Sequence, residues 1–374
     1  MKSTGIALVV LALAAVLTTC GGGSGTSLTT DICTAPSAPS GVAATKIVSA
    51  SVGNNTNASG ICIAYKTITA ALAASSASDV VWVAPGTYDA ANGEVFPIRV
   101  PAGVSLIGDT ANKGAGGTAT LIKGHGALTG SMAGWYAALI SGATATISGF
   151  EFDDTTSTTL SFGIYSDNVS MAVTDNLFLT NLYGGVVFEN GANPSVRNNT
   201  FQSSSYGVYS MCTGTATIQS NTFTDTSFPI DNAVGNAIVE GNTITRLGNG
   251  QVGIQIQHGS PSIQNNTFAA SGFTYGALHV QNSASPIVRG NIINAGTGYA
   301  VLTEDTSAPD LGTALSSGSN VFSSITGTVI SHGSSATINA LGNTWPSGPS
   351  CGSQIITSGT GTVVWGGGAG DHCP

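Results

Sequence analysis

The sequence predicts an all-β protein, a solenoid in which short parallel strands stack into about 9 to 11 coils. Three observations predict it. Only 7% of the 374 residues are charged and 51 are Gly, which excludes coiled coils and long solvated helices because their outer faces need many Lys and Glu. An Asn followed by a large apolar residue recurs about every 24 residues. The segments between these Asn residues alternate like strands and lack a helical period.

The first 20 residues predict a lipoprotein signal peptide. Residues 5–17 are apolar, too short a run to span a bilayer but long enough for the core of a signal peptide. The segment Leu17-Thr18-Thr19-Cys20 resembles a bacterial lipobox, which implies lipidation of Cys20. The alternative is ordinary cleavage nearby, with Cys20 as a spare thiol. We expect an exported protein, anchored by lipid alone to the bacterial cell envelope, at the outer membrane or the cell surface.

Residues 21–59 are expected to form a flexible tether and an N-terminal extension, because Gly and Ser dominate their start. Residues 60–144 are expected to form an N-terminal cap and the first coils. Within them, Ile68, Ala71 and Leu72 give a short helix one apolar face, which would cover the open end of the core. Such a cap protects strand edges from aggregation.

Residues 145–345 carry the repeat. The intervals between successive repeat Asn residues are 23, 22, 21, 24, 25, 29 and 23. We expect these Asn residues to turn the chain in left-handed geometry and to hydrogen-bond up the stack as a ladder. The predicted ladder consists of Asn176, Asn199, Asn221, Asn242, Asn266 and Asn291.

This repeat resembles the right-handed parallel β-helix of the pectin-lyase-like superfamily. Upstream, residues 65–72, 80–88, 93–98 and 104–108 resemble four segments of the DUF1565 family, a domain of unknown function. The resemblance implies a single-stranded right-handed parallel β-helix. Catalysis on this scaffold usually concerns acidic polysaccharides.

Residues 346–374 are expected to form a C-terminal cap. Export permits disulfides, and the cysteines near the two ends suggest Cys33 with Cys62 and Cys351 with Cys373. Cys212 is left over and is expected to be a buried apolar side chain.

One predicted column of outward side chains lies two residues before each repeat Asn. It contains Arg197, Glu240 and Arg289, which would serve as acid or base and as anion-binding groups in a polysaccharide lyase or hydrolase. The favoured interpretation is a hydrogen-bonded polar ladder, because each Arg would lie two coils, roughly 9.6 Å, from Glu240. Basic residues are also scarce, with 9 Lys and Arg against 18 Asp and Glu, so nucleic acid is not an expected partner.

A second column holds Tyr165, Tyr209, Gln255 and His279. Aromatic and amide side chains on a flat sheet are suited to stacking on a glycan and hydrogen-bonding to it. The alternative is that they are ordinary exposed strand residues.

The densest acidic group is Glu151, Asp153 and Asp154. Calcium is one interpretation and loop solvation the favoured one, since no calcium-binding repeat is present. We therefore expect no cofactor, and a monomeric, non-catalytic envelope protein that binds glycans or other surface polymers, or acts as a structural module. The alternative is a polysaccharide lyase or glycoside hydrolase.

Overall fold

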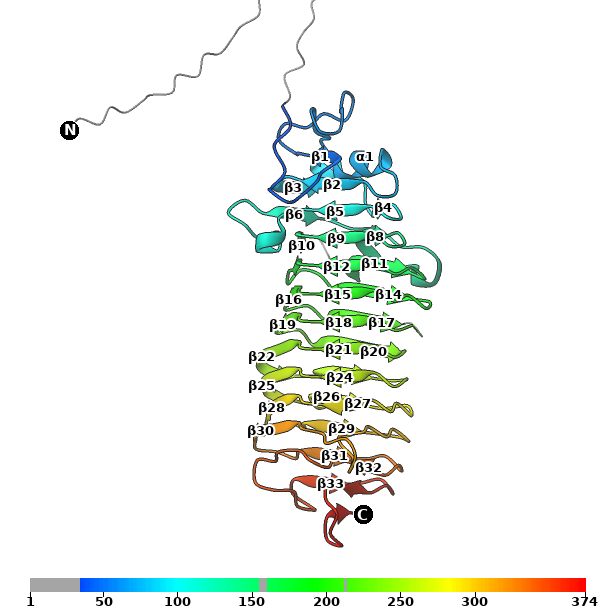
Figure 1. The fold of residues 1–374 in the computed structure, drawn as a ribbon, viewed down its shortest axis with the longest axis vertical. Helices are drawn as coiled ribbons and strands as arrows, with labels where there is room; N and C mark the ends of the chain where they lie inside the picture. The colour runs from blue at the N-terminus through cyan, green and yellow to red at the C-terminus, as the bar shows by residue number, and fades with distance from the viewer. Residues whose placement is uncertain (1–33, 155–159, 212–213) are drawn as a thin grey trace, which may run out of the picture. The chain divides into compact units, whose positions relative to one another are not determined.

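A computed structural model describes residues 34–154, 160–211 and 214–374. In these residues the chain winds into a parallel β-helix, as expected from the sequence, with three long sheets running along one axis (Figure 1). One of these sheets has eleven strands stacked one per coil, which marks about eleven coils. Each of these coils adds a parallel strand to the preceding one, which spaces equivalent residues by roughly 4.8 Å.

The strands of sheet A are β1 (Lys46–Val48), β2 (Val80–Val83), β5 (Ser105–Ile107), β9 (Thr146–Ser148), β12 (Ala172–Thr174), β15 (Ser195–Arg197), β18 (Thr217–Gln219), β21 (Ile238–Glu240), β24 (Ser262–Gln264) and β27 (Ile287–Arg289). Strand β1 lies in residues 21–59, the segment expected to form a tether and an N-terminal extension. Part of that segment therefore belongs to sheet A.

The strands of sheet B are β3 (Gly86–Asp89), β6 (Thr120–Lys123), β10 (Glu151–Asp153), β13 (Leu177–Phe178), β16 (Thr200–Gln202), β19 (Thr222–Thr224), β22 (Thr243–Gly250), β25 (Thr267–Phe273), β28 (Ile292–Gly296) and β30 (Val321–Ile325).

The strands of sheet C are β4 (Ile98–Val100), β8 (Tyr136–Ser141), β11 (Ser161–Asp167), β14 (Gly184–Glu189), β17 (Tyr206–Met211), β20 (Phe228–Val234), β23 (Ile254–Ile256), β26 (Leu278–Val280), β29 (Val301–Thr303), β31 (Ile330–His332) and β33 (Ile355–Thr357), with β7 (Gly126–Ala127) paired to β8. A small C-terminal sheet contains β32 (Ile338–Asn339), β34 (Val363–Val364) and β35 (His372–Cys373).

Helical structure is scarce in the described residues. Its elements are the α-helix α1 (Ile68–Ala73) and the short 3-10 helices η1 (Ala90–Asn92), η2 (Thr110–Asn112) and η3 (Gly130–Met132). Ile68, Ala71 and Leu72 on α1 are buried in the core at the N-terminal end of the described coils. None of the described helices has the length and apolar character needed to cross a membrane.

The core is built from side chains that repeat from coil to coil. Phe152, Phe178, Phe201 and Phe223 are fully buried and stack in sequence, with ring centroids 4.8 to 4.9 Å apart. Because the stacking distance matches the rise of one coil, each ring contacts its equivalents above and below. The apolar residue that follows the repeat Asn in the sequence is therefore the one that fills the core.

The predicted Asn ladder is present. Each side-chain amide donates to Oδ1 of the Asn one coil later over 2.9 to 3.1 Å, and the ladder continues beyond Asn291 to Asn320 and Asn343. The six predicted members are at most 1% exposed. Buried amides of this kind stabilise the stack only because their hydrogen bonds are made.

The expectation that the ladder Asn itself adopts left-handed geometry is wrong. The left-handed residue precedes it, as in Asp175, Asn198 and Ser220, with φ between 53° and 56°. No predicted ladder Asn has a positive φ. The preceding residue makes the bend, and the ladder Asn then turns its side chain into the core.

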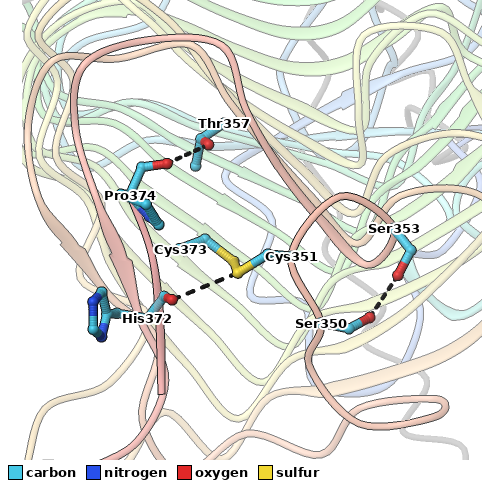
Figure 2. Close-up of a disulfide and its surroundings, with 7 residues drawn as sticks. All are labelled: Ser350, Cys351, Ser353, Thr357, His372, Cys373 and Pro374. Carbon is cyan, nitrogen blue, oxygen red and sulfur yellow. Dashed lines mark hydrogen bonds between the residues drawn. A yellow bond between two sulfur atoms is a disulfide. The ribbon is translucent and has the colours of Figure 1, made fainter. Parts of the chain in front are cut away.

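The C-terminal end is closed by a disulfide between Cys351 and Cys373, the pairing expected from the sequence, with Cα atoms 5.5 Å apart (Figure 2). The Thr357 hydroxyl beside it donates to the Pro374 carbonyl over 2.6 Å. Cys33, Cys20 and Cys212 lie outside the described residues, as do the predicted signal peptide and the first part of the tether. The Cys33–Cys62 pairing stays a prediction.

Candidate functional site

The polar column of sheet A has the register expected from the sequence. Arg197 pairs with Gln219, Gln219 with Glu240, Glu240 with Gln264, and Gln264 with Arg289. Both arginines thus lie two coils from Glu240, roughly 9.6 Å along the axis.

The charged groups of this column are engaged with the protein. Glu240 accepts from the Gln219 amide over 2.6 Å. Arg197 donates to the Ser195 hydroxyl over 2.7 Å, and Arg289 forms an ion pair with Asp310 at 2.6 Å. The three side chains proposed as a catalytic set are therefore not brought together, and the column has the features of a polar ladder.

The acidic group of β10 is also held by protein donors. Asp153 accepts from the Asn181 amide over 2.7 Å, and Asp154 contacts His125 Nδ1 at 2.6 Å. Burial raises the pKa of Glu151, with a further contribution from the Asp153 charge. Within the described ranges, no group of three or more His, Cys, Asp or Glu side chains is arranged to hold a metal ion.

The outward column of sheet C runs Tyr165, Val187, Tyr209, Asp231, Gln255 and His279 in register. Sequence reasoning missed Asp231, because its strand begins Phe228-Pro229 and lacks the Gly that marked the others. The signal was the spacing: Tyr209 and Gln255 are 46 residues apart, about two repeats, so a column member had to lie midway.

Tyr165 departs from the expected exposed position. It is 5% exposed, and its hydroxyl donates to Glu189 over 2.5 Å. The segment that contains β7 and η3 places Leu128 and Met132 in the same apolar cluster, on the outer face of sheet C. This loop covers the first coils of the column, so an exposed surface begins only further along.

Aromatic rings continue from the edge of that loop along sheet C. Trp135 contacts Tyr183 and Tyr209 with centroids 6.0 and 6.3 Å apart, and Tyr183 contacts Tyr206 at 5.4 Å. Tyr206 stacks on Phe228 at 5.2 Å with their planes 16° apart. We call these five residues the aromatic column.

The aromatic column ends at a hollow of about 350 Å³. Tyr206, Tyr209 and Phe228 form one wall, with Tyr206 stacked on Phe228. Tyr275 and His279 form the other wall, stacked on each other with centroids 6.1 Å apart. Tyr275 is 48% exposed. Parallel pairing puts Phe228 about two coils from His279, roughly 9.6 Å, and Tyr209 about three coils from it, roughly 14.4 Å.

The floor between the walls is polar apart from one side chain. It consists of Asp231, Val252, Gln255 and Gln257. We call these four residues and the five wall residues the sheet C groove. None of the nine is Lys or Arg.

The electrostatics of the groove are dominated by Asp231. The residue is 4% exposed, and burial raises the pKa of its carboxyl from 3.8 to about 7. Burial also raises the pKa of the Tyr206 and Tyr209 hydroxyls, so both are neutral donors. At the far wall, His279 Nε2 lies 3.0 Å from Glu304. The groove can therefore offer aromatic faces, amides and hydroxyls around one buried carboxyl.

A second hollow of about 360 Å³ lies toward the N-terminal coils, where His125 and Asp154 meet Lys123 and Phe96. In register, Lys123 is flanked by Asp89 and Asp153 on the neighbouring coils. These acids lie beside Lys123 in the sheet, and the rings in the hollow are Phe96 and His125, the latter in contact with Asp154. The sheet C groove is the better-equipped site.

Comparison with known proteins matches one family model and finds similar solved structures. The family model described as a protein of unknown function (DUF1565) matches residues 51–351. No curated protein matches the chain. Among solved structures, the DFA-IIIase from Arthrobacter chlorophenolicus A6 in complex with DFA-III is similar with a TM-score of 0.46 and 12% identity, covering 75% of this chain and 74% of that chain.

Proposed function

The chain belongs to the DUF1565 family of proteins of unknown function, and from that premise we propose that it is a non-catalytic envelope protein that binds glycans in the sheet C groove. One observation carries the proposal. Two aromatic walls, about two to three coils apart, enclose a floor of amides and a carboxyl. Sugars present apolar ring faces to aromatic side chains and hydroxyls to amides, so the groove suits them on both counts.

The chemistry of the groove supports binding over catalysis. Acid–base hydrolysis of a glycosidic bond uses two carboxyl groups flanking that bond. Asp231 is the one carboxyl among the nine groove residues. Glu304 contacts His279 but does not line the groove. A lyase needs a cation to neutralise the uronate carboxylate, and no Lys or Arg lines the groove.

We also propose that the protein is held at the bacterial outer membrane or cell surface by a lipid on Cys20, and acts as a monomer. The lipobox-like segment before Cys20 and the Gly-rich residues after it support this arrangement. A radiolabelled fatty acid fed to expressing cells should label the wild-type chain and not Cys20→Ala. Equal labelling of both would overturn the anchor and leave glycan binding untouched.

The binding proposal is tested by affinity electrophoresis of the full chain in mild detergent, through gels containing neutral, amino or acidic polysaccharides. We expect retardation on at least one of them without release of reducing ends or unsaturated products. Tyr275→Ala removes one half-exposed side chain of the groove wall. The variant should therefore keep its fold, and its retardation should fall. Leu315→Ala, a fully exposed side chain outside the groove, is the matched control. Product release would replace the binding proposal by the polysaccharide lyase or hydrolase alternative.

A further inference from the structure

Asp231 is a buried carboxyl whose hydrogen bonding is incomplete. It is 4% exposed, and the Gln257 amide donates to its Oδ1 over 3.5 Å, beyond the usual length of a hydrogen bond. With one long hydrogen bond, the carboxyl keeps the capacity to accept a stronger donor. The groove itself is where that donor would lie.

None of the groove residues around Asp231 is a Lys or Arg that could supply a charged donor. Tyr209 precedes it in the column on β17 and Gln255 follows it on β23. Tyr206 is the second phenol near it, and both phenols are neutral since burial raises their pKa. On β26, two coils away, His279 contacts Glu304. The facing groups are therefore neutral, apart from the His279–Glu304 pair.

A buried carboxyl among neutral groups favours a cationic ligand over a neutral or anionic one. Burial raises the pKa of Asp231 to about 7 because ionisation without a nearby cation is costly. A ligand ammonium at hydrogen-bond distance would offset that cost and lower the pKa again. A uronate carboxylate would instead meet a carboxyl and no cation. The aromatic faces of Phe228 and Tyr275 also attract cations.

We propose that the sheet C groove recognises a sugar that carries a free amino group, such as a glucosamine unit of a de-N-acetylated glycan. Its ammonium donates to Asp231, and its ring lies between the Phe228 wall and the Tyr275 wall. This inference rests on the proposed function and names its ligand class. Asp231 is the residue that determines specificity.

The test measures binding of the full chain to five probes by isothermal titration calorimetry at about pH 6, where the glucosamine amino group, less basic than that of lysine because of its neighbouring ring oxygens, is largely an ammonium that can donate to Asp231. The probes are hexamers of β-1,4-linked glucosamine, N-acetylglucosamine and glucose, a galacturonate hexamer, and hexalysine. The glucosamine hexamer should bind at least about ten-fold more tightly than the other four. Asp231→Asn should bring it down to the affinity of the N-acetylglucosamine hexamer.

Two controls keep the result interpretable. Glu240→Gln removes one negative charge from sheet A and should leave the preference unchanged. Asp231→Asn should fold normally, because it replaces a poorly satisfied carboxyl by an amide of the same shape, and its thermal unfolding midpoint checks this.

Each of the other outcomes overturns the amino-sugar inference, and some of them also overturn the proposed function. Equal affinity for glucosamine, N-acetylglucosamine and glucose, or a preference for galacturonate, would overturn the amino-sugar inference and leave glycan binding standing. Binding of hexalysine alone would indicate a basic peptide partner and overturn both. Binding of none of the four sugars would overturn the proposed function and this inference with it.

Discussion

Asn221 and Asn242 are joined by two hydrogen bonds to one oxygen. The side-chain amide of Asn221 donates to Asn242 Oδ1 over 3.0 Å, and its backbone N–H donates to the same atom over 2.9 Å. Asn199 makes the same pair of bonds to Asn221 one coil earlier. Each ladder carbonyl thus satisfies two buried donors, which fixes the register between consecutive coils.

We predict that Asn221→Ala is strongly destabilising. The substitution leaves the backbone N–H of Asn199 unsatisfied in the core and takes from the Val196 carbonyl the Asn221 Nδ2 donor at 2.9 Å, whereas the Asn199 side-chain amide keeps the Val173 and Arg197 carbonyls. Each buried unsatisfied group costs about 1–3 kcal/mol, so a loss of about 4 kcal/mol is expected. Thermal unfolding followed by circular dichroism measures it. The exposed Gln251→Ala is the control, and an equal midpoint for the two variants would contradict the role of the ladder.

Much of the fold follows from the sequence because a solenoid repeats one local pattern. Once the Asn interval was known, in-register stacking placed Glu240 beside Gln219 and Gln264, as the structure has them. The candidate site was harder to predict from the sequence. The contact of the η3 loop with Tyr165 depends on residues far apart in the chain. The position of Asp231 in the column follows from the repeat spacing, but its burial does not, because no local pattern reports it.

We predict that Glu94→Ala destabilises the N-terminal coils. The buried Glu94 carboxylate accepts from the backbone N–H of Ile68 over 2.5 Å and of Thr69 over 3.0 Å, at the start of α1. Removing it leaves two helix-terminal donors without that partner, at a cost of about 3 kcal/mol. Hydrogen exchange of residues 68–73 should accelerate in this variant. The exposed Val95→Ala next to it should exchange like the wild type, and equal rates in the two variants would rule out the capping role.

We predict that Cys351→Ser loosens the C-terminal cap without unfolding the central coils. The disulfide closes a loop whose ends are 22 residues apart, and constraining a loop of that size contributes about 3 kcal/mol. Hydrogen exchange should accelerate in β33 and β35 and stay unchanged in β18. Ser347→Ala, exposed in the same segment, is the control. Acceleration spread evenly over all coils would contradict a local effect.

Our last prediction concerns the pH dependence of stability. The Asp231 carboxyl keeps its proton up to about pH 7 in the folded chain, whereas an unfolded Asp loses it near about pH 4. Between these values the folded state binds more protons, so the free energy of unfolding falls as pH rises. The contribution of Asp231 is fully present below about pH 4 and lost above about pH 7, and a three-unit shift sets its size at about 4 kcal/mol at most. Asp231→Asn lacks this group and keeps the other acids. The unfolding midpoint of the wild type, measured against that of the variant, should therefore fall across this window and level off above it, and a constant difference from pH 4 to 8 would show that Asp231 ionises normally.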